Sequence, residues 1–160
     1  RLYLVGEGGE DYVAALKRKA AGLGLADNVS FLGRKANEEA LAIVAASDAV
    51  GVPHQWPKEF GPVILVEALA LGRPVITSGI GAPREFVRDG GNGFIVDDFT
   101  NPAAFAGKIR QFFAEPQLAA RMGKQARESA AFLSPARTTA KLSSLSRELI
   151  AGKNGRPEGW

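Results

Sequence analysis

The apolar residues of this chain fall into short continuous runs that alternate with longer stretches of helical spacing. The short runs predict strands at residues 1–6, 28–33, 48–53, 74–77 and 93–97. Stretches with apolar positions three or four residues apart predict helices at 12–23, 37–46, 63–71 and 82–89. Beyond residue 101 only helical spacing remains, in segments that each have a proline near the first turn: 102–114, 116–132 and 135–151.

This alternation of strands and helices predicts the fold class α/β. We expect a doubly wound, Rossmann-like parallel sheet of about five strands, with helices on both faces and extra C-terminal helices. Ligands of such sheets bind beyond the carboxyl ends of the strands. The loops of interest are therefore 6–10, 33–37, 53–61 and 78–82, together with the turn after residue 97.

One residue breaks the pattern of the helix at 63–71. Glu67 lies in an otherwise apolar run, PVILV-E-ALAL. A carboxylate that is buried without a partner costs on the order of several kcal/mol. Glu67 is therefore expected to have a protein partner, to face a cleft or to carry a proton. A structural carboxylate paired with an arginine is the plain alternative to a ligand-binding one.

The start of the same helix is a candidate phosphate site. Gly61 and Pro62 precede the apolar run, and the first turn of a helix offers free N–H donors and a positive dipole end. Glu67 would lie about 9 Å along the helix axis, and Glu59 would lie on the other side of the helix end. Two acceptor carboxylates around an anion site suit a ligand with hydroxyls on both sides of a phosphate, such as a nucleotide sugar.

Other loops carry weaker signals. The stretch VGEGGE lacks the last glycine of the dinucleotide-binding fingerprint, because Asp11 stands there, which argues against a dehydrogenase domain. The only histidine, His54, shares a loop with Glu59 and is a candidate substrate contact, with an ordinary polar loop residue as the alternative. Loop 78–82 exposes backbone ahead of a helix, and we expect Glu85 to cap or orient that turn.

Composition narrows the classes of function. With 160 residues, 46% hydrophobic and 23% charged, we expect one globular domain. The absence of Cys excludes disulfides and thiol catalysis, and with a single His no zinc site is expected. Residues 1–107 have 10 basic and 13 acidic side chains, whereas 108–160 have 10 and 4. This basic region suits an anionic membrane or partner, or is simply a solvated helical face. Without interleaved aromatic residues, no nucleic-acid partner is expected.

Taken together, the motifs resemble a known family. The segments LYLVGEGGE, NVSFLG, ASDAVGVP, EFGPVILVEALALGRPVITSGIGAPREFV and GGNGFIVDD occur in this order within residues 1–98, about 60% of the chain. They resemble the C-terminal, donor-binding domain of family-4 retaining glycosyltransferases, which have the two-domain GT-B fold. Glu59 and Glu67 match the E-x7-E pair of that family.

The resemblance implies a role for each matching position. Glu59, the candidate catalytic residue, would contact hydroxyls of the donor sugar, and Glu67 would contact the ribose. The remaining implied donor-binding positions are the diphosphate cradle at Gly61, Pro62, Val63 and Ile64, the base contacts Arg34 and Lys35, and the loop residues Gly6 and Gly8.

The resemblance also implies an organisation and an activity. Residues 1–151 would form the donor-binding domain and 152–160 a loose tail, with the N-terminal acceptor domain outside this chain. The intact enzyme would transfer a hexosyl group, with retention, from a nucleoside-diphosphate sugar to a sugar or lipid-linked acceptor, without metal or other cofactor. We expect this domain to be inactive alone, and a cytoplasmic location with peripheral contact to the inner membrane face. A non-catalytic module that docks through the basic C-terminal helices is the alternative. A hydrolase with two carboxylates is disfavoured, because a helix end lies between them.

Overall fold

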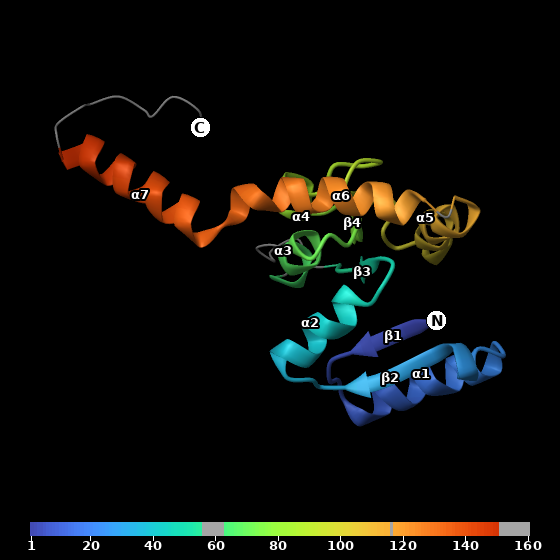
Figure 1. The fold of residues 1–160 in the computed structure, drawn as a ribbon. Helices are drawn as coiled ribbons and strands as arrows, with labels where there is room; N and C mark the ends of the chain where they lie inside the picture. Colours follow the sequence, from blue (N-terminus) through green and yellow to red (C-terminus); the bar gives the residue numbers. More distant parts are fainter. Residues whose placement is uncertain (56–62, 116, 151–160) are drawn as a thin grey trace. The chain divides into compact units, whose positions relative to one another are not determined.

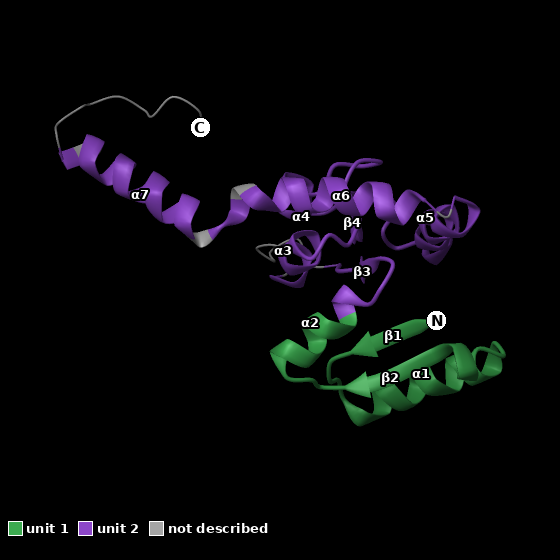
Figure 2. Ribbon diagram, in the orientation of Figure 1, with its two compact units in different colours: residues 1–43 green, residues 44–160 purple. Residues whose placement is uncertain are grey.

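The computed structural model of the protein describes residues 1–55, 63–115 and 117–150. The chain divides into two compact units, Arg1–Ile43 and Val44–Trp160 (Figure 2). The boundary falls inside helix α2 (Asn37–Ala45), so one continuous helix belongs to both units.

Unit 1 is a parallel strand pair with a crossover helix. Strand β1 (Leu2–Val5) pairs in parallel with β2 (Val29–Gly33), and helix α1 (Glu10–Gly22) and the short 3₁₀ helix η1 (Ala26–Asn28) connect them. None of the residues 1–43 is fully buried. Apolar side chains of α1 are at most half-buried, and Leu23, just after the helix, is 64% exposed.

Unit 2 contains a three-stranded parallel sheet in the order β3-β4-β5; β3 and β4 are labelled in Figure 1. The strands are β3 (Val50–Val52), β4 (Val75–Ser78) and β5 (Gly93–Val96). The central strand β4 is buried along its whole length, and its Val-Ile-Thr sequence suits a strand covered on both faces.

Five α-helices and one 3₁₀ helix of unit 2 follow β3 in the described part of the chain. They are α3 (Val63–Ala70), α4 (Pro83–Phe86), α5 (Pro102–Ala114), α6 (Leu118–Ala130), η2 (Ala131–Leu133) and α7 (Pro135–Ile150), with the end of α2 at the unit's start. Successive side chains of β4 point to opposite faces of the sheet and therefore belong to two apolar clusters. Val75 joins Leu65 and Leu69 of α3 in one cluster, and Ile76 joins Phe94 of β5 and Met122 of α6 in the other.

Two glycines bring α6 against the end of α3. A Cβ atom on Gly123 would lie 2.3 Å from the carbonyl oxygen of Gly72, closer than any real contact. Gly72 itself has φ +71°, the left-handed conformation that often ends a helix. The two backbones can therefore touch because Gly123 has no side chain, while Gly72 supplies the left-handed turn.

A buried asparagine fastens the turn before β5 to α6. The Asn92 Oδ1 accepts a hydrogen bond from the Arg88 backbone N–H at 2.7 Å. Its Nδ2 donates to the Phe86 carbonyl and to the Ser129 Oγ, each at 2.9 Å. Ser129 in turn donates to the Ala126 carbonyl at 2.7 Å. Every polar atom of the Asn92 side chain is thus used within the protein.

The predicted α/β class with parallel strands is confirmed, and each predicted strand and helix has a counterpart. The strands are hydrogen-bonded as a pair in unit 1 and a triple in unit 2. The helix predicted at 82–89 is shorter, because Val87 has the extended values φ −102° and ψ 125° and ends α4 at Phe86. The helix predicted at 116–132 divides into α6 and η2.

Candidate functional site

Helix α3 positions Glu67 at the border between its buried and its exposed face. Leu65, Ala68 and Leu69 are buried, with the i, i+3, i+4 spacing of one helical face. Val63, by contrast, is 71% exposed, so α3 is buried on one side rather than on most sides. Glu67 is half-buried between these extremes.

The Glu67 carboxylate makes no hydrogen bond and no ion pair with any residue that the structure describes. Arg73, six residues further along, instead donates from Nη2 to the Ala45 carbonyl at the end of α2. The structural alternative, a carboxylate paired with an arginine, is therefore not found in the described part of the chain. The Glu67 carboxylate therefore lies on a mostly apolar helix, and no described residue donates a hydrogen bond to it.

Part of the predicted site lies outside the described residues. Glu59, Gly61 and Pro62 belong to the segment 56–62 and have no structural account here. Of the four positions expected around a diphosphate, Val63 and Ile64 are described, and they form the first turn of α3. Val63 is exposed and Ile64 is half-buried.

His54 connects two loops that follow neighbouring strands. Its Nε2 lies 2.9 Å from the Ile80 carbonyl oxygen, and its Nδ1 lies 3.4 Å from the Val52 carbonyl oxygen. The half-buried ring therefore holds the end of β3 to the loop after β4. A direct donor contact by His54 stays a prediction, and its ring nitrogens already have neighbours within the protein.

The loop after β4 is held by an arginine that sequence reasoning missed. Arg84 donates from Nε to the Gly79 carbonyl at 2.7 Å, and its Nη2 pairs with the Asp97 carboxylate. The Gly79 N–H donates to the Val96 carbonyl at 2.8 Å, which ties the loop to β5 as well. The Glu85 side chain, which was expected to cap or orient this turn, makes no hydrogen bond among the described residues, although the Glu85 backbone N–H donates to the Ala82 carbonyl at 2.9 Å. Among the described residues, the neighbouring Arg84 is the side chain that holds this turn.

The two loops singled out in unit 1 lie side by side. The Gly6 N–H donates to the Gly33 carbonyl at 2.9 Å, and the Arg34 guanidinium pairs with the Glu7 carboxylate at 2.8 Å. Both side chains of this pair are well exposed, so the pair is worth about 1 kcal/mol or less. Unit 1 therefore brings its Gly-rich loop and its Arg34 together, with the neighbouring Lys35 half-buried.

Residues 1–55, 63–115 and 117–150 contain neither a cluster of metal ligands nor a helix that could span a membrane. Within these ranges no three His, Asp or Glu side chains gather closely enough to hold a metal ion. In the same ranges every helix is too short or too polar to cross a bilayer.

The order of the motifs and the fold agree with a known family. The family profile described as "Glycosyl transferases group 1" matches residues 1–129. The chain belongs to this family. The resemblance that the sequence motifs indicated is thereby confirmed.

A curated relative has similar sequence over most of this chain. D-inositol 3-phosphate glycosyltransferase of Corynebacterium glutamicum is 34% identical over 138 residues, which are 86% of this chain and 32% of that protein. The chain therefore spans about a third of the length of this glycosyltransferase relative.

Solved structures in this family show related folds with ligands. HepE of Anabaena in complex with UDP is 31% identical, with a TM-score of 0.75 over 89% of this chain and 40% of that one. The same protein in complex with UDP-glucose is 32% identical, with a TM-score of 0.71 over 81% of this chain and 35% of that one. A related protein thus binds a nucleotide sugar on a closely similar fold.

Proposed function

We propose that this glycosyltransferase chain binds a nucleoside-diphosphate sugar. We further propose that the protein to which it belongs transfers a hexosyl group, with retention, to a sugar or lipid-linked acceptor. Family membership supports the class of reaction, and the UDP and UDP-glucose complexes of HepE support the class of donor.

The observation that carries the proposal is the lack of a described partner for the Glu67 carboxylate. This carboxylate is half-buried on an apolar helix and has no partner among the described residues. Such an acceptor is stabilised when a ligand donates hydrogen bonds to it. The two vicinal hydroxyls of a ribose are donors of suitable spacing, and a bidentate contact with a carboxylate is charge-assisted and strong.

The other predicted site residues have proposed roles in binding the rest of the donor. Glu59 would contact the donor sugar as the catalytic residue. The backbone at Gly61, Pro62, Val63 and Ile64 would cradle the diphosphate. Arg34 and Lys35 would lie against the base, with Gly6 and Gly8 close to the donor and His54 contacting it or holding its loop.

Catalysis would be electrostatic. Departure of the nucleoside diphosphate concentrates negative charge on its phosphates, and N–H donors at the start of a helix stabilise that charge more in the transition state than before it. With these donors in place the proposal needs no metal ion and no cofactor. An acceptor-binding domain outside this chain would supply the second substrate, so the isolated chain should bind donor without turnover.

Calorimetric titration of UDP, and separately of GDP, tests the proposal. Glu67→Gln keeps the shape of the side chain but removes its charge, and should weaken binding of the preferred nucleotide about 10- to 100-fold. Glu128→Gln, the same change on an exposed residue of α6, is the control and should leave affinity unchanged. Addition of EDTA should also leave it unchanged. Equal affinity of Glu67→Gln and parent would reject the ribose contact, and a parent that binds neither nucleotide would reject the function.

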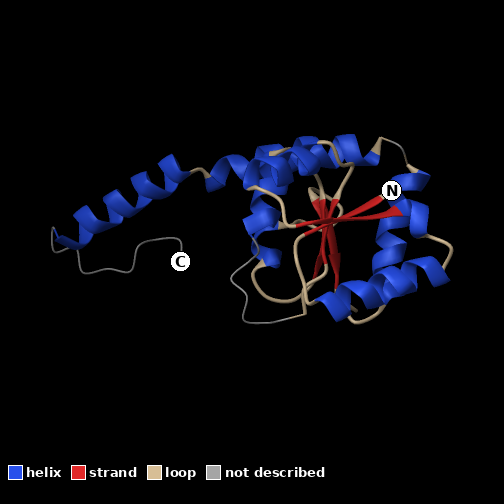
Figure 3. Cartoon of the chain, turned by 90° about the horizontal axis from the view of Figure 1, so that it is seen from below, coloured by secondary structure: helices blue, strands red, loops and turns tan. Residues whose placement is uncertain are grey.

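One observation favours a second, compatible role. Helix α7 extends away from the other helices of unit 2 in both views (Figures 1 and 3), and Leu142 and Ile150 are exposed beside the basic residues Lys141 and Arg147. An exposed helix with apolar and basic side chains suits an anionic membrane surface. Such docking would hold a cytoplasmic protein at the inner membrane face. Sedimentation with anionic liposomes should decrease as salt is raised.

A further inference from the structure

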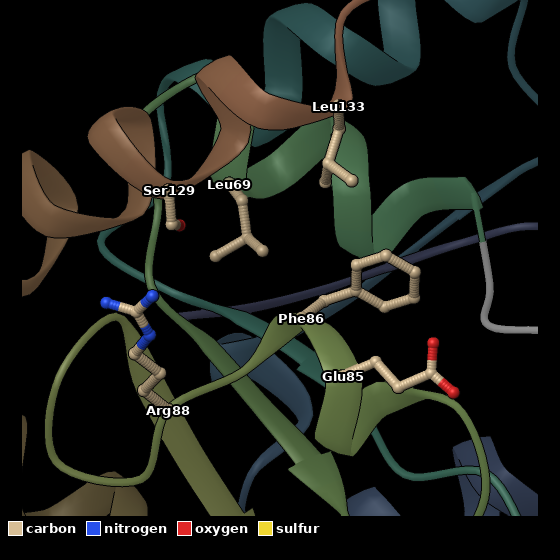
Figure 4. Close-up of a pocket in the computed structure, with 6 residues that line it drawn as sticks. All are labelled: Leu69, Glu85, Phe86, Arg88, Ser129 and Leu133. Carbon is tan, nitrogen blue, oxygen red and sulfur yellow. The ribbon is translucent and has the colours of Figure 1, made fainter. Parts of the chain in front are cut away.

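A hollow of about 210 Å³ lies in unit 2 between α3, α4 and the junction of α6 with η2 (Figure 4). Its lining combines three apolar side chains, one hydroxyl and two opposite charges: Leu69, Phe86, Leu133, Ser129, Arg88 and Glu85. Leu69 forms part of the floor and is only 1% exposed.

This hollow is separate from the proposed donor site. Leu69 follows Glu67 by two positions on α3, and successive residues of a helix are about 100° apart around its axis. The two side chains therefore leave α3 about 200° apart, on opposite faces. A molecule in the hollow would touch α3 from the side away from Glu67.

The apolar half of the hollow fixes the size of an occupant. Leu69 and Phe86 point into it and Leu133 closes it from above, as Figure 4 shows. An apolar cavity of about 150 Å³ accommodates benzene. A hollow of about 210 Å³ therefore has room for one ring with one small substituent.

The polar half fixes the charge of the occupant. The Arg88 guanidinium rises beside the hollow toward Ser129 (Figure 4) and has no ion pair among the described residues. Its backbone N–H is bound by Asn92 Oδ1, which anchors the residue from which the side chain extends. Ser129 already donates its hydroxyl proton to the Ala126 carbonyl, so it has none to give to an anion. Arg88 is thus the group available to hold a negative charge.

The exposed Glu85 carboxylate disfavours a second negative charge on the occupant. This carboxylate lies on the other side of the opening from Arg88 and has no partner among the described residues (Figure 4). A second negative charge on the occupant would be repelled by it. A planar carboxylate, in contrast, matches the two-pronged guanidinium and carries only one charge.

We propose that this hollow binds a small monocarboxylate with a single apolar ring. The carboxylate pairs with Arg88, and the ring packs among Leu69, Phe86 and Leu133. The proposal is independent of the proposed transferase function, because none of these side chains belongs to the predicted donor site.

Titration of the isotope-labelled full chain with benzoate, followed by backbone amide NMR, tests this inference. We expect millimolar affinity, in keeping with so few ligand atoms, and shifts confined to Leu69 and its neighbours on α3 and to residues 85–88 and 129–133. Arg88→Gln should weaken benzoate binding about tenfold and leave the weaker binding of benzyl alcohol unchanged. Arg110→Gln, an exposed arginine of α5, is the matched control and should bind as the parent does.

Two results would overturn the inference. The first is equal benzoate affinity of Arg88→Gln and parent, and the second is shifts scattered over basic residues of the whole surface. A charge comparison adds an independent check. Phenylphosphonate, when doubly charged, should bind more weakly than benzoate to the parent, and Glu85→Gln should reduce that difference. A difference unaffected by Glu85→Gln would contradict the role given to Glu85.

Discussion

Replacing Asn92 by Leu tests the buried polar contact that joins the turn before β5 to α6. Leu has a similar volume but can form none of the three hydrogen bonds of this 1%-exposed side chain. Leaving their partners unsatisfied costs about 1–3 kcal/mol each, of which better apolar burial offsets roughly 1–2 kcal/mol. Three such losses outweigh the offset, so we expect the free energy of unfolding to fall by about 2–7 kcal/mol, and the melting temperature by about 5–20 °C.

Urea unfolding followed by circular dichroism measures this loss. Asn101→Leu is the control, because the exposed Asn101 side chain accepts a hydrogen bond from the Ala103 N–H at the start of α5 and donates one only to the exposed Asp98 carboxylate. Loss of such a helix cap costs about 1 kcal/mol. If Asn92→Leu cost no more than Asn101→Leu, the reasoning from buried hydrogen bonds would be refuted.

The remaining predictions concern a close backbone contact and an ion pair. Gly123→Ala places a methyl group against the Gly72 carbonyl and should destabilise by about 1–3 kcal/mol, whereas Gly107→Ala, with open space around it in α5, should stabilise by about 0.5–1 kcal/mol. If the melting temperatures of Gly123→Ala and Gly107→Ala shifted in the same direction, this reasoning from backbone contact would be contradicted. The hydrogen bond from Arg121 lowers the pKa of Glu115, so the pair stabilises the fold above the unfolded pKa and loses this effect as pH falls through the folded one. Arg121→Gln should therefore flatten the acid side of a stability–pH profile, and an unchanged profile would count against the pair.

The sequence predicts elements well wherever the signal is local. The helix expected at 102–114 is found as Pro102–Ala114, because Asn101 caps it and proline suits its first turn. Leu23 shows the limit of periodicity. It continues the apolar spacing of α1 but lies beyond the helix and is exposed.

Residues whose partners are distant in the sequence are harder to identify from the sequence alone. Glu67 could be singled out because a charge in an apolar run conflicts with burial, but the lack of a described partner is a three-dimensional fact. Arg84 and His54 hold carbonyl groups of the loop after β4, and a carbonyl acceptor has no sequence signature. Asn92 likewise reads as an ordinary turn residue between glycines, although its side chain is almost fully enclosed.

The strand order has a consequence for synthesis on the ribosome. Each parallel pairing joins strands that follow one another along the chain: β1 with β2, β3 with β4, and β4 with β5. A polypeptide that emerges N-terminus first can therefore dock β2, β4 and β5 each on the strand just completed, without opening an earlier pairing. Vectorial growth of this kind keeps loop closures short, which favours rapid formation and limits the time that an unpaired edge is exposed to other nascent chains.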